Sequence, residues 1–491
     1  MLPLHVDSLR MPMRSIESNQ VFRAHKSRSL VAFLAIGLLV IALGWIAIET
    51  NFLVLIIAIL VFVGFPFVVY CFYDIKFGIM LTITLSFFIL GIKRIIGDVP
   101  LGLVMDGLVL LLAVSMLFGL AKSGKWVIFN NRISYAILAW MIYNILEAAN
   151  PWAASVEAWA YTVRAMAGQM VMFFIVLYAV DSLKFVKIML SLWICLALLA
   201  ALWGLHQEYM GFLPFEERWV MEDFERFALL FQMGRFRKFS FMPDAMTFGF
   251  VMSYSAVLCI VLALGPRSRN NRLFLIFCTI CMLLAMVYSG TRAAYVLLPV
   301  GAFLYLLLNL NFKLLVYSIV AIALAVVFIN TPINNVNVIR VQSAFKPGED
   351  ASYNTRKRNQ KMIQPYLWTH PMGGGLGSTG DWGERFSPGS FLSTFPPDSG
   401  YMRIVVEAGP IGLAIYLYLL YTVMAEGIKN YYVLKNAKLK SYLLAMLCVT
   451  FALMIANFPQ EATGQIPTSL FLYVLFAMIC KIKVYDTEEL K

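Results

Sequence analysis

The sequence predicts an all-α fold, a polytopic transmembrane bundle of about 12–14 helices with two long extracytoplasmic loops, the second of them partly helical. Its 491 residues are 61% hydrophobic and only 13% charged, whereas soluble proteins carry about 25% charged residues. Apolar runs long enough to cross a bilayer recur along the whole chain. This composition excludes a soluble enzyme, a nucleic-acid-binding protein and a disordered chain.

Fourteen apolar runs are candidate membrane spans, because about 20 mostly apolar residues cross a bilayer as a helix. They are 30–48, 53–72, 77–92, 103–120, 133–148, 165–180, 188–205, 245–264, 273–289, 294–310, 314–329, 406–425, 441–457 and 467–480. The runs at 77–92 and 103–120 are short and flanked by Gly and Pro, which also allows a partly re-entrant pair.

The chain divides into seven consecutive segments. We expect a basic cytoplasmic N-terminus (1–28), N-terminal helices (29–205), a first extracytoplasmic loop (206–244), central helices (245–329), a large extracytoplasmic catalytic loop (330–405), C-terminal helices (406–480) and a cytoplasmic tail (481–491). Lys and Arg gather in the short loops of one side when the N-terminus is cytoplasmic. This asymmetry predicts that both termini face the cytoplasm.

The two long outer segments are basic and contain aromatic residues. Segments of this length are usually functional or disordered. Aromatic residues argue for order, so we expect both segments to pack as a lid. These aromatic residues are Trp219, Phe224, Phe236, Tyr366, Trp368 and Trp382.

The outer segments also hold arginines beside a carboxylate. Arginine forks bind phosphate oxygens bidentately, and a lipid-linked diphosphate has its headgroup at this depth. The chemistry that this suggests is glycosyl transfer, with a general base for the acceptor hydroxyl. Asp398 is the first candidate base and Glu407 the second. The candidate substrate-binding residues are Arg235, Arg237, Arg292, Arg356, Arg358, Tyr401 and Arg403.

Four segments in this part of the chain resemble the bacterial O-antigen ligase/polymerase family. They are Arg237-Lys-Phe-Ser-Phe-Met-Pro-Asp244, Ser289-Gly-Thr-Arg292, His370-Pro-Met-Gly-Gly-Gly-Leu-Gly377, and Asp398-Ser-Gly-Tyr401 with Glu407-x-Gly409-x-x-Gly412. Asp398 stands where the ligases have a histidine. In this respect the chain looks more like the exopolysaccharide-polymerase branch. The resemblance spans about 230–425.

The resemblance implies an undecaprenyl-diphosphate-linked oligosaccharide donor and a saccharide or lipid A core acceptor. It also implies inverting, metal-independent transfer without a cofactor, at the outer face of the bacterial inner membrane. Arg237 and Arg292 would hold the diphosphate, and Asp398 would take the place of the histidine. A chain-length regulator is the protein partner that a polymerase would have. Polymerase and ligase both stay open.

Each candidate residue also has a structural interpretation. Arg292 can snorkel to headgroups, and Arg235 and Arg237 can be solvated loop charges. Asp398 can cap a helix N-terminus, and Glu407 can pair with Arg403 one helical turn away. The remaining alternatives concern a solvated helix face for Arg356, Lys357 and Arg358, a turn for His370, interfacial packing for His206, a cavity wall or re-entrant turn for Asp106, and a pair of Arg164 with Glu157.

A transporter or lipid flippase with a cationic cavity is the alternative function. Transporters tend to show inverted repeats and paired broken helices. The sequence has no visible internal symmetry, and its polar segments lie on one side only. A one-sided catalytic site therefore fits the sequence better than a transport path does.

Overall fold

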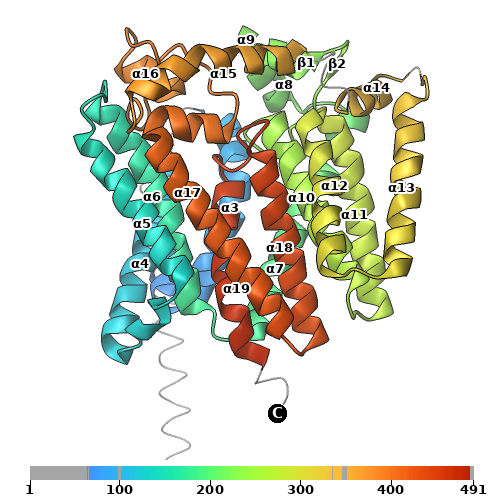
Figure 1. Cartoon of the computed structure of the whole chain (residues 1–491), viewed down its shortest axis with the longest axis horizontal. Coiled ribbons are helices and arrows are strands. Elements are labelled where there is room, and N and C mark those ends of the chain that lie inside the picture. Colours follow the sequence, from blue (N-terminus) through green and yellow to red (C-terminus); the bar gives the residue numbers. More distant parts are fainter. Residues whose placement is uncertain (1–63, 65, 98–100, 334, 346–350, 487–491) are drawn as a thin grey trace, which may run out of the picture. The chain divides into compact units, whose positions relative to one another are not determined.

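The computed structural model describes residues 64, 66–97, 101–333, 335–345 and 351–486. Residues 71–491 form one compact unit, and the description that follows concerns this unit. Its long helices stand side by side, and short helices lie across one end of them (Figure 1). We call this end the capped end. The predicted all-α bundle is confirmed.

The helices and strands follow one another in a simple order. They are α3 (Ile75–Ile96), α4 (Gly102–Ser123), η1 (Trp126–Phe129), α5 (Arg132–Leu146), η2 (Glu147–Ala149), α6 (Val156–Ala179), α7 (Leu183–Tyr209), α8 (Pro214–Met221), α9 (Phe224–Leu230), β1 (Phe231–Gln232), β2 (Arg235–Phe236), α10 (Ala245–Leu264), α11 (Arg269–Ser289), α12 (Arg292–Leu308), α13 (Phe312–Asn330), α14 (Val336–Ser343), α15 (Ala351–Thr369), α16 (Gly380–Phe386), α17 (Gly400–Val433), α18 (Ala437–Ala456), α19 (Thr468–Lys481) and η4 (Ile482–Asp486).

Each of the twelve candidate runs from 77–92 onward coincides with a helix. In the described residues, nine of these helices are long and apolar enough to cross a membrane, and α5, α12 and α13 are not among the nine. The candidate run 30–48 and most of 53–72 lie outside the described residues. The re-entrant alternative for 77–92 and 103–120 is wrong, because α3 and α4 are continuous helices of 22 residues each.

Helices α10, α18 and α19 form the centre of the bundle. Most of their side chains are buried, and aromatic rings fill the space between helices. The Trp193 ring of α7 stacks on Phe471 of α19 with centroids 3.5 Å apart. The Trp193 indole N–H donates to the Ser255 hydroxyl at 3.0 Å. A buried indole needs such a partner, so this contact fixes α7 against α10 and α19.

The two long segments at the capped end are folded, as expected. The first segment forms α8, α9 and a hairpin of two short strands, β1 and β2, with two residues each. The second segment forms α14, α15 and α16. Trp382 stacks on Tyr161 at 4.7 Å, and Trp219 packs on Phe239 at 5.2 Å. The expected packing is wrong for Phe224 and Trp368, whose side chains are 83% and 81% exposed.

Helix α17 consists of two helical parts joined at a kink. Gly409 has φ +70° and ψ 177°, so the helical backbone is interrupted there. Pro410 follows directly and starts the second part, because proline is tolerated in the first turn of a helix. The N-cap of α17 is Ser399, whose hydroxyl accepts from the Met402 N–H at 3.4 Å. The capping role considered for Asp398 is therefore wrong.

Candidate functional site

The glycine-rich turn at 370–377 packs directly on the kink of α17. The Gly374 N–H donates to the Val406 carbonyl, and the Gly375 N–H donates to the Glu407 carbonyl, each at 2.9 Å. A Cβ atom on Gly373 would lie 2.5 Å from the Gly409 nitrogen. Only glycine permits this approach of two backbones, which explains why the sequence has glycines at both places.

Residues at the end of α5 hold this turn from the other side. The Asn150 side-chain amide donates to the Met372 carbonyl at 3.0 Å and to the Glu147 carboxylate at 2.7 Å. The Tyr143 hydroxyl donates to the Ala408 carbonyl at 2.6 Å. Burial raises the pKa of Glu147 above its ordinary value, and the Asn150 hydrogen bond opposes this rise. The turn and the kink thus form one braced unit.

The Glu407 carboxylate lies within this unit and is buried. It accepts from the Gly377 N–H at 3.1 Å and from the Thr379 hydroxyl. The Arg403 Nε lies 4.0 Å from the same carboxylate, one helical turn earlier. The predicted pairing of Glu407 with Arg403 is therefore present at the limit of ion-pair distance.

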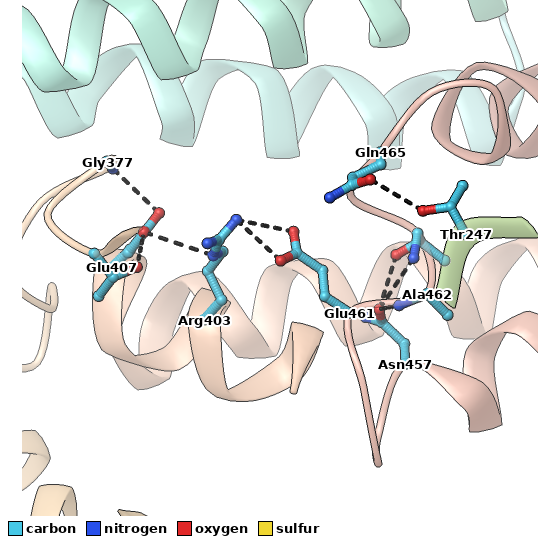
Figure 2. A network of polar contacts seen from close by, with 10 residues as sticks. Thr247, Gly377, Arg403, Glu407, Asn457, Glu461, Ala462 and Gln465 are labelled. Atoms are coloured by element: carbon cyan, nitrogen blue, oxygen red, sulfur yellow. Dashed lines mark hydrogen bonds and ion pairs between the residues drawn. The ribbon is translucent and has the colours of Figure 1, made fainter. Parts of the chain in front are cut away.

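Arg403 makes its closer ion pair with Glu461, which precedes α19. The Arg403 Nη1 lies 3.0 Å and 3.1 Å from the two carboxylate oxygens of Glu461. Figure 2 shows the Arg403 guanidinium between Glu407 and Glu461. The Asn457 amide oxygen accepts from the Ala462 N–H at 3.1 Å and so shapes the loop that carries Glu461.

A cavity of about 390 Å³ opens beside these residues. Its charged lining consists of Arg403 against three carboxylates, those of Asp381, Glu407 and Glu461. Its aromatic lining consists of Trp140, Trp382, Tyr416 and Tyr473, and its amides include Gln169, Asn457 and Gln465. We call it the central cavity. A concave site with aromatic walls and a few convergent polar groups is typical of small-molecule binding.

Three arginines gather at the Ser289–Arg292 turn. The Arg237 guanidinium donates to the Ser289 carbonyl at 2.9 Å and to the Thr291 hydroxyl at 3.0 Å. Burial lowers the pKa of Arg237, Asp244 opposes this, and nearby Arg340 and Arg292 lower it further. Burial also lowers the pKa of Arg340. We call Arg237, Arg292 and Arg340 the arginine cluster. Its concentrated positive charge favours an anion.

Polar contacts lead from the arginine cluster toward the central cavity. Asp244 caps α10 by accepting from the Thr247 N–H at 2.7 Å. The Thr247 hydroxyl lies 3.0 Å from the amide oxygen of Gln465, a residue that lines the central cavity (Figure 2). Arg237 and Asp244 both come from the segment before α10, and Thr247 at the start of α10 connects this segment to Gln465.

Asp398 lies outside the central cavity. It is exposed, and its carboxylate accepts from the Asn359 side chain of α15 at 3.0 Å. Asp398 and Arg356 line a separate shallow pocket of about 10 Å³. The Arg356 guanidinium donates to the Pro459 carbonyl at 2.7 Å. The two predicted catalytic residues, Asp398 and Glu407, are thus in different pockets.

The other predicted site residues also have defined places. Tyr401 donates its hydroxyl to the Met454 carbonyl at 2.8 Å and does not line the central cavity. Arg235 is exposed and lies 4.0 Å from Glu208. Arg358 is exposed on α15. The structure therefore brings Arg403 and Glu407 together in one cavity and Arg237 and Arg292 together at one turn.

The structure also decides between several structural interpretations. His370 follows α15 and stacks on Tyr366 with centroids 3.8 Å apart, as expected of a turn residue. The pairing of Arg164 with Glu157 is wrong, because the Arg164 Nε lies 3.1 Å from Asp106 instead. Asp106 belongs to continuous α4 and lines a second cavity, so it does not lie at a re-entrant turn.

Sequence reasoning missed Glu461 and Arg340. A signal for Glu461 was present, because the loop Asn457–Pro467 between two apolar runs holds Asn, Gln and Glu within a few residues. Such a concentration of polar side chains in a loop that leads into a buried helix suggests a site, because binding residues are often found on loops held by a rigid scaffold. For Arg340 the sequence offers no such signal, since that residue is one of many basic residues of its segment.

One part of the chain is similar to a known family. Residues 277–417 match the family model described as O-antigen ligase. The match runs from α11 past the kink of α17 and includes three of the four resembling segments; Arg237–Asp244 lies before it. No curated protein sequence matches the chain.

A membrane-embedded helical bundle with a polar cavity at one end defines the class of protein. Within this class, the match supports assigning the chain to the O-antigen ligase family. The predicted resemblance is thereby confirmed. The family implies a multi-pass bacterial membrane enzyme that transfers glycosyl groups in the assembly of lipopolysaccharide or another polysaccharide.

Proposed function

We propose that this protein transfers or polymerises oligosaccharide units carried on a lipid diphosphate, with the reacting sugars in the central cavity. The observation that carries the proposal is the position of Arg403 between Glu407 and Glu461 in a cavity of about 390 Å³. The cavity lies against the glycine-rich turn and the kink, both within the residues that match the family. Its charges and aromatic walls suit a sugar.

The charges of the central cavity and of the arginine cluster favour different roles for the two. The central cavity has three carboxylates for one arginine, and such a site stabilises the positive charge of an oxocarbenium-like transition state. Trp382 offers a flat apolar surface to the C–H face of a sugar ring. The arginine cluster, with Arg237, Arg292 and Arg340, provides the positive charge that a leaving diphosphate needs.

In the proposed reaction Glu461 is the general base. Its side chain is 22% exposed and lines the central cavity, so it can reach an acceptor hydroxyl. Glu461 takes the hydroxyl proton, the acceptor oxygen forms a bond with the anomeric carbon, and the carbon–oxygen bond to the diphosphate breaks. The diphosphate leaves with the electron pair, and attack from the opposite face inverts the configuration.

The two bases expected from the sequence take other places in this scheme. Glu407 is buried, with its two oxygens bonded to the Gly377 N–H and the Thr379 hydroxyl, so it serves to position Arg403 and the turn. Asp398 is the second candidate base. It would require an acceptor bound at the exposed pocket beside Arg356.

We further propose that the capped end faces the outer side of the bacterial inner membrane and that both termini are cytoplasmic. The loop charges favour this orientation. The donor would be an undecaprenyl-diphosphate-linked oligosaccharide, and the acceptor a saccharide or lipid A core. A chain-length regulator would accompany a polymerase. Metal independence follows the family resemblance, and a chelator should then leave the rate unchanged.

The deciding experiment is an assay of the purified protein in detergent with lipid-linked oligosaccharide. The expected result is a lengthened or transferred glycan together with free lipid diphosphate. A parallel assay follows movement of the same lipid across liposomes. Translocation without any new glycosidic bond would overturn the enzyme proposal and favour a flippase.

A further inference from the structure

A second cavity of about 370 Å³ lies beside the central cavity. Helices α3, α4, α6 and the start of α19 line it, with apolar side chains that include Leu90, Met105, Val109 and Leu470. We call it the side cavity. Its lining residues all lie outside the residues 277–417 that match the family, so the family match assigns no role to it.

The side cavity and the central cavity share a wall. Ala165 and Gln169 of α6 line both of them, and so do Gly464 and Gln465 of the loop before α19. Gln465 is also the residue that contacts Thr247, at 3.0 Å. A molecule bound in the side cavity therefore lies next to the place where the sugars would react.

An ion pair lies in the wall of the side cavity. The Arg164 Nε is 3.1 Å from the Asp106 carboxylate, and the Arg164 side chain is 44% exposed. Both residues belong to helices that qualify as membrane spans. Ionisable residues at such positions are costly and usually face a functional cavity. A half-exposed arginine fork retains donors for a phosphate group.

We propose that the side cavity binds the lipid anchor of a second substrate, with its phosphate at Arg164 and its first apolar units against Leu90, Met105 and Val109. This rests on the proposed function. A transfer between two lipid-linked glycans requires two headgroups at once. The arginine cluster would hold the donor diphosphate, and Arg164 would hold the phosphate of a lipid-linked acceptor. The occupant is a phosphorylated polyisoprenoid.

The test measures how many lipids the full-length protein binds. Purified protein in nanodiscs of zwitterionic lipid is titrated with radiolabelled polyprenyl diphosphate that carries no sugar. The wild type should bind two equivalents. Arg164→Gln should bind one, and Arg237→Gln should also bind one, each through loss of a different site, so that the double variant binds none.

A second variant removes the space and keeps the ion pair. A Cβ atom on Gly168, which lines the side cavity, would meet no atom within 4 Å. Gly168→Leu should therefore fold and fill the cavity, and it should lose the same equivalent as Arg164→Gln. Gly107→Leu is the matched control, because Gly107 also has open space around it but does not line the cavity. It should keep both equivalents.

Two results would overturn the inference. One is retention of both equivalents by Arg164→Gln and Gly168→Leu. The other is displacement of the Arg164-dependent equivalent by phosphatidic acid as readily as by polyprenyl diphosphate, which would make the site one for ordinary bilayer lipids. The transfer assay separates this from the proposed function. If the wild type binds two equivalents but never transfers sugar, the proposed function fails and the lipid site stands.

Discussion

The Arg403 Nη1 lies 3.0 Å and 3.1 Å from the two carboxylate oxygens of Glu461. This pair joins α17, which the family model matches in its first part, to the loop before α19, which lies outside the match. Because Glu407 lies on the other side of Arg403 at 4.0 Å, the guanidinium fixes both carboxylates relative to each other. The reactive geometry therefore depends on a residue that the match does not include.

Glu461→Gln should lower the transfer rate by about 10²–10⁴-fold, the usual contribution of a general base. The amide keeps the size of the side chain and can still accept from Arg403, so the protein should be expressed and folded normally. Single-turnover rates with bound lipid-linked oligosaccharide measure the effect. Asp398→Asn is the comparison and should lower the rate less than tenfold. A larger loss for Asp398→Asn would move the base to the exposed pocket.

Arg340→Gln should weaken donor binding. Hydrogen bonds to charged groups contribute about 1.5–3 kcal/mol, so KM for the lipid-diphosphate donor should rise about 10- to 100-fold, with a smaller change in kcat. Arg235→Gln is the matched control on the exposed hairpin and should change KM less than threefold. Equal KM values for the wild type and Arg340→Gln would remove Arg340 from the diphosphate site.

The fold was predictable because hydrophobicity over about 20 residues is a local property of the chain. The predicted runs 245–264 and 467–480 match the bounds of α10 and α19 to within one residue. The kink at Gly409 was only partly predictable from the sequence. Pro410 suits the start of a helix, but nothing in the sequence indicates that a first helical part already begins after Ser399. The contact between Gly373 and Gly409 is nonlocal, and their separate turn signals cannot reveal it.

The types of residue at the site were predictable from the sequence, but which of these residues lie together in the fold was less so. Arg403 and Glu407 share a helical face one turn apart, so their proximity followed from helix geometry. Glu461 joins them from another loop, and only tertiary packing of α17 against α19 brings it there. Asp398 was favoured because of its place in a motif, whereas its exposure depends on how α15 covers the start of α17.

Gly409→Ala should destabilise the protein. An alanine at φ +70° is strained by roughly 1–3 kcal/mol, and its Cβ atom would also collide with the Pro371 carbonyl. We expect a lower apparent Tm in detergent and a loss of transfer. Gly389→Ala is the control, because a Cβ atom there meets nothing within 4 Å. If Gly409→Ala has the same apparent Tm as the wild type, the close contact between the turn and the kink does not stabilise the fold.

Glu147 should make the stability depend on pH. Burial raises the pKa of its carboxyl in the folded protein, so folding favours the neutral form. The contribution of Glu147 to stability is fully present below its unfolded-state pKa and is lost as the pH rises through the folded-state pKa.

Glu147→Gln cannot ionise and keeps the hydrogen-bond acceptor for Asn150. Its apparent Tm should therefore fall less than that of the wild type as the pH rises from the unfolded-state pKa through the raised folded-state pKa, as measured by thermal unfolding in detergent. Glu217→Gln, at an exposed position of α8, should follow the wild-type curve. Parallel curves for the wild type and Glu147→Gln would mean that Glu147 does not oppose folding when it ionises.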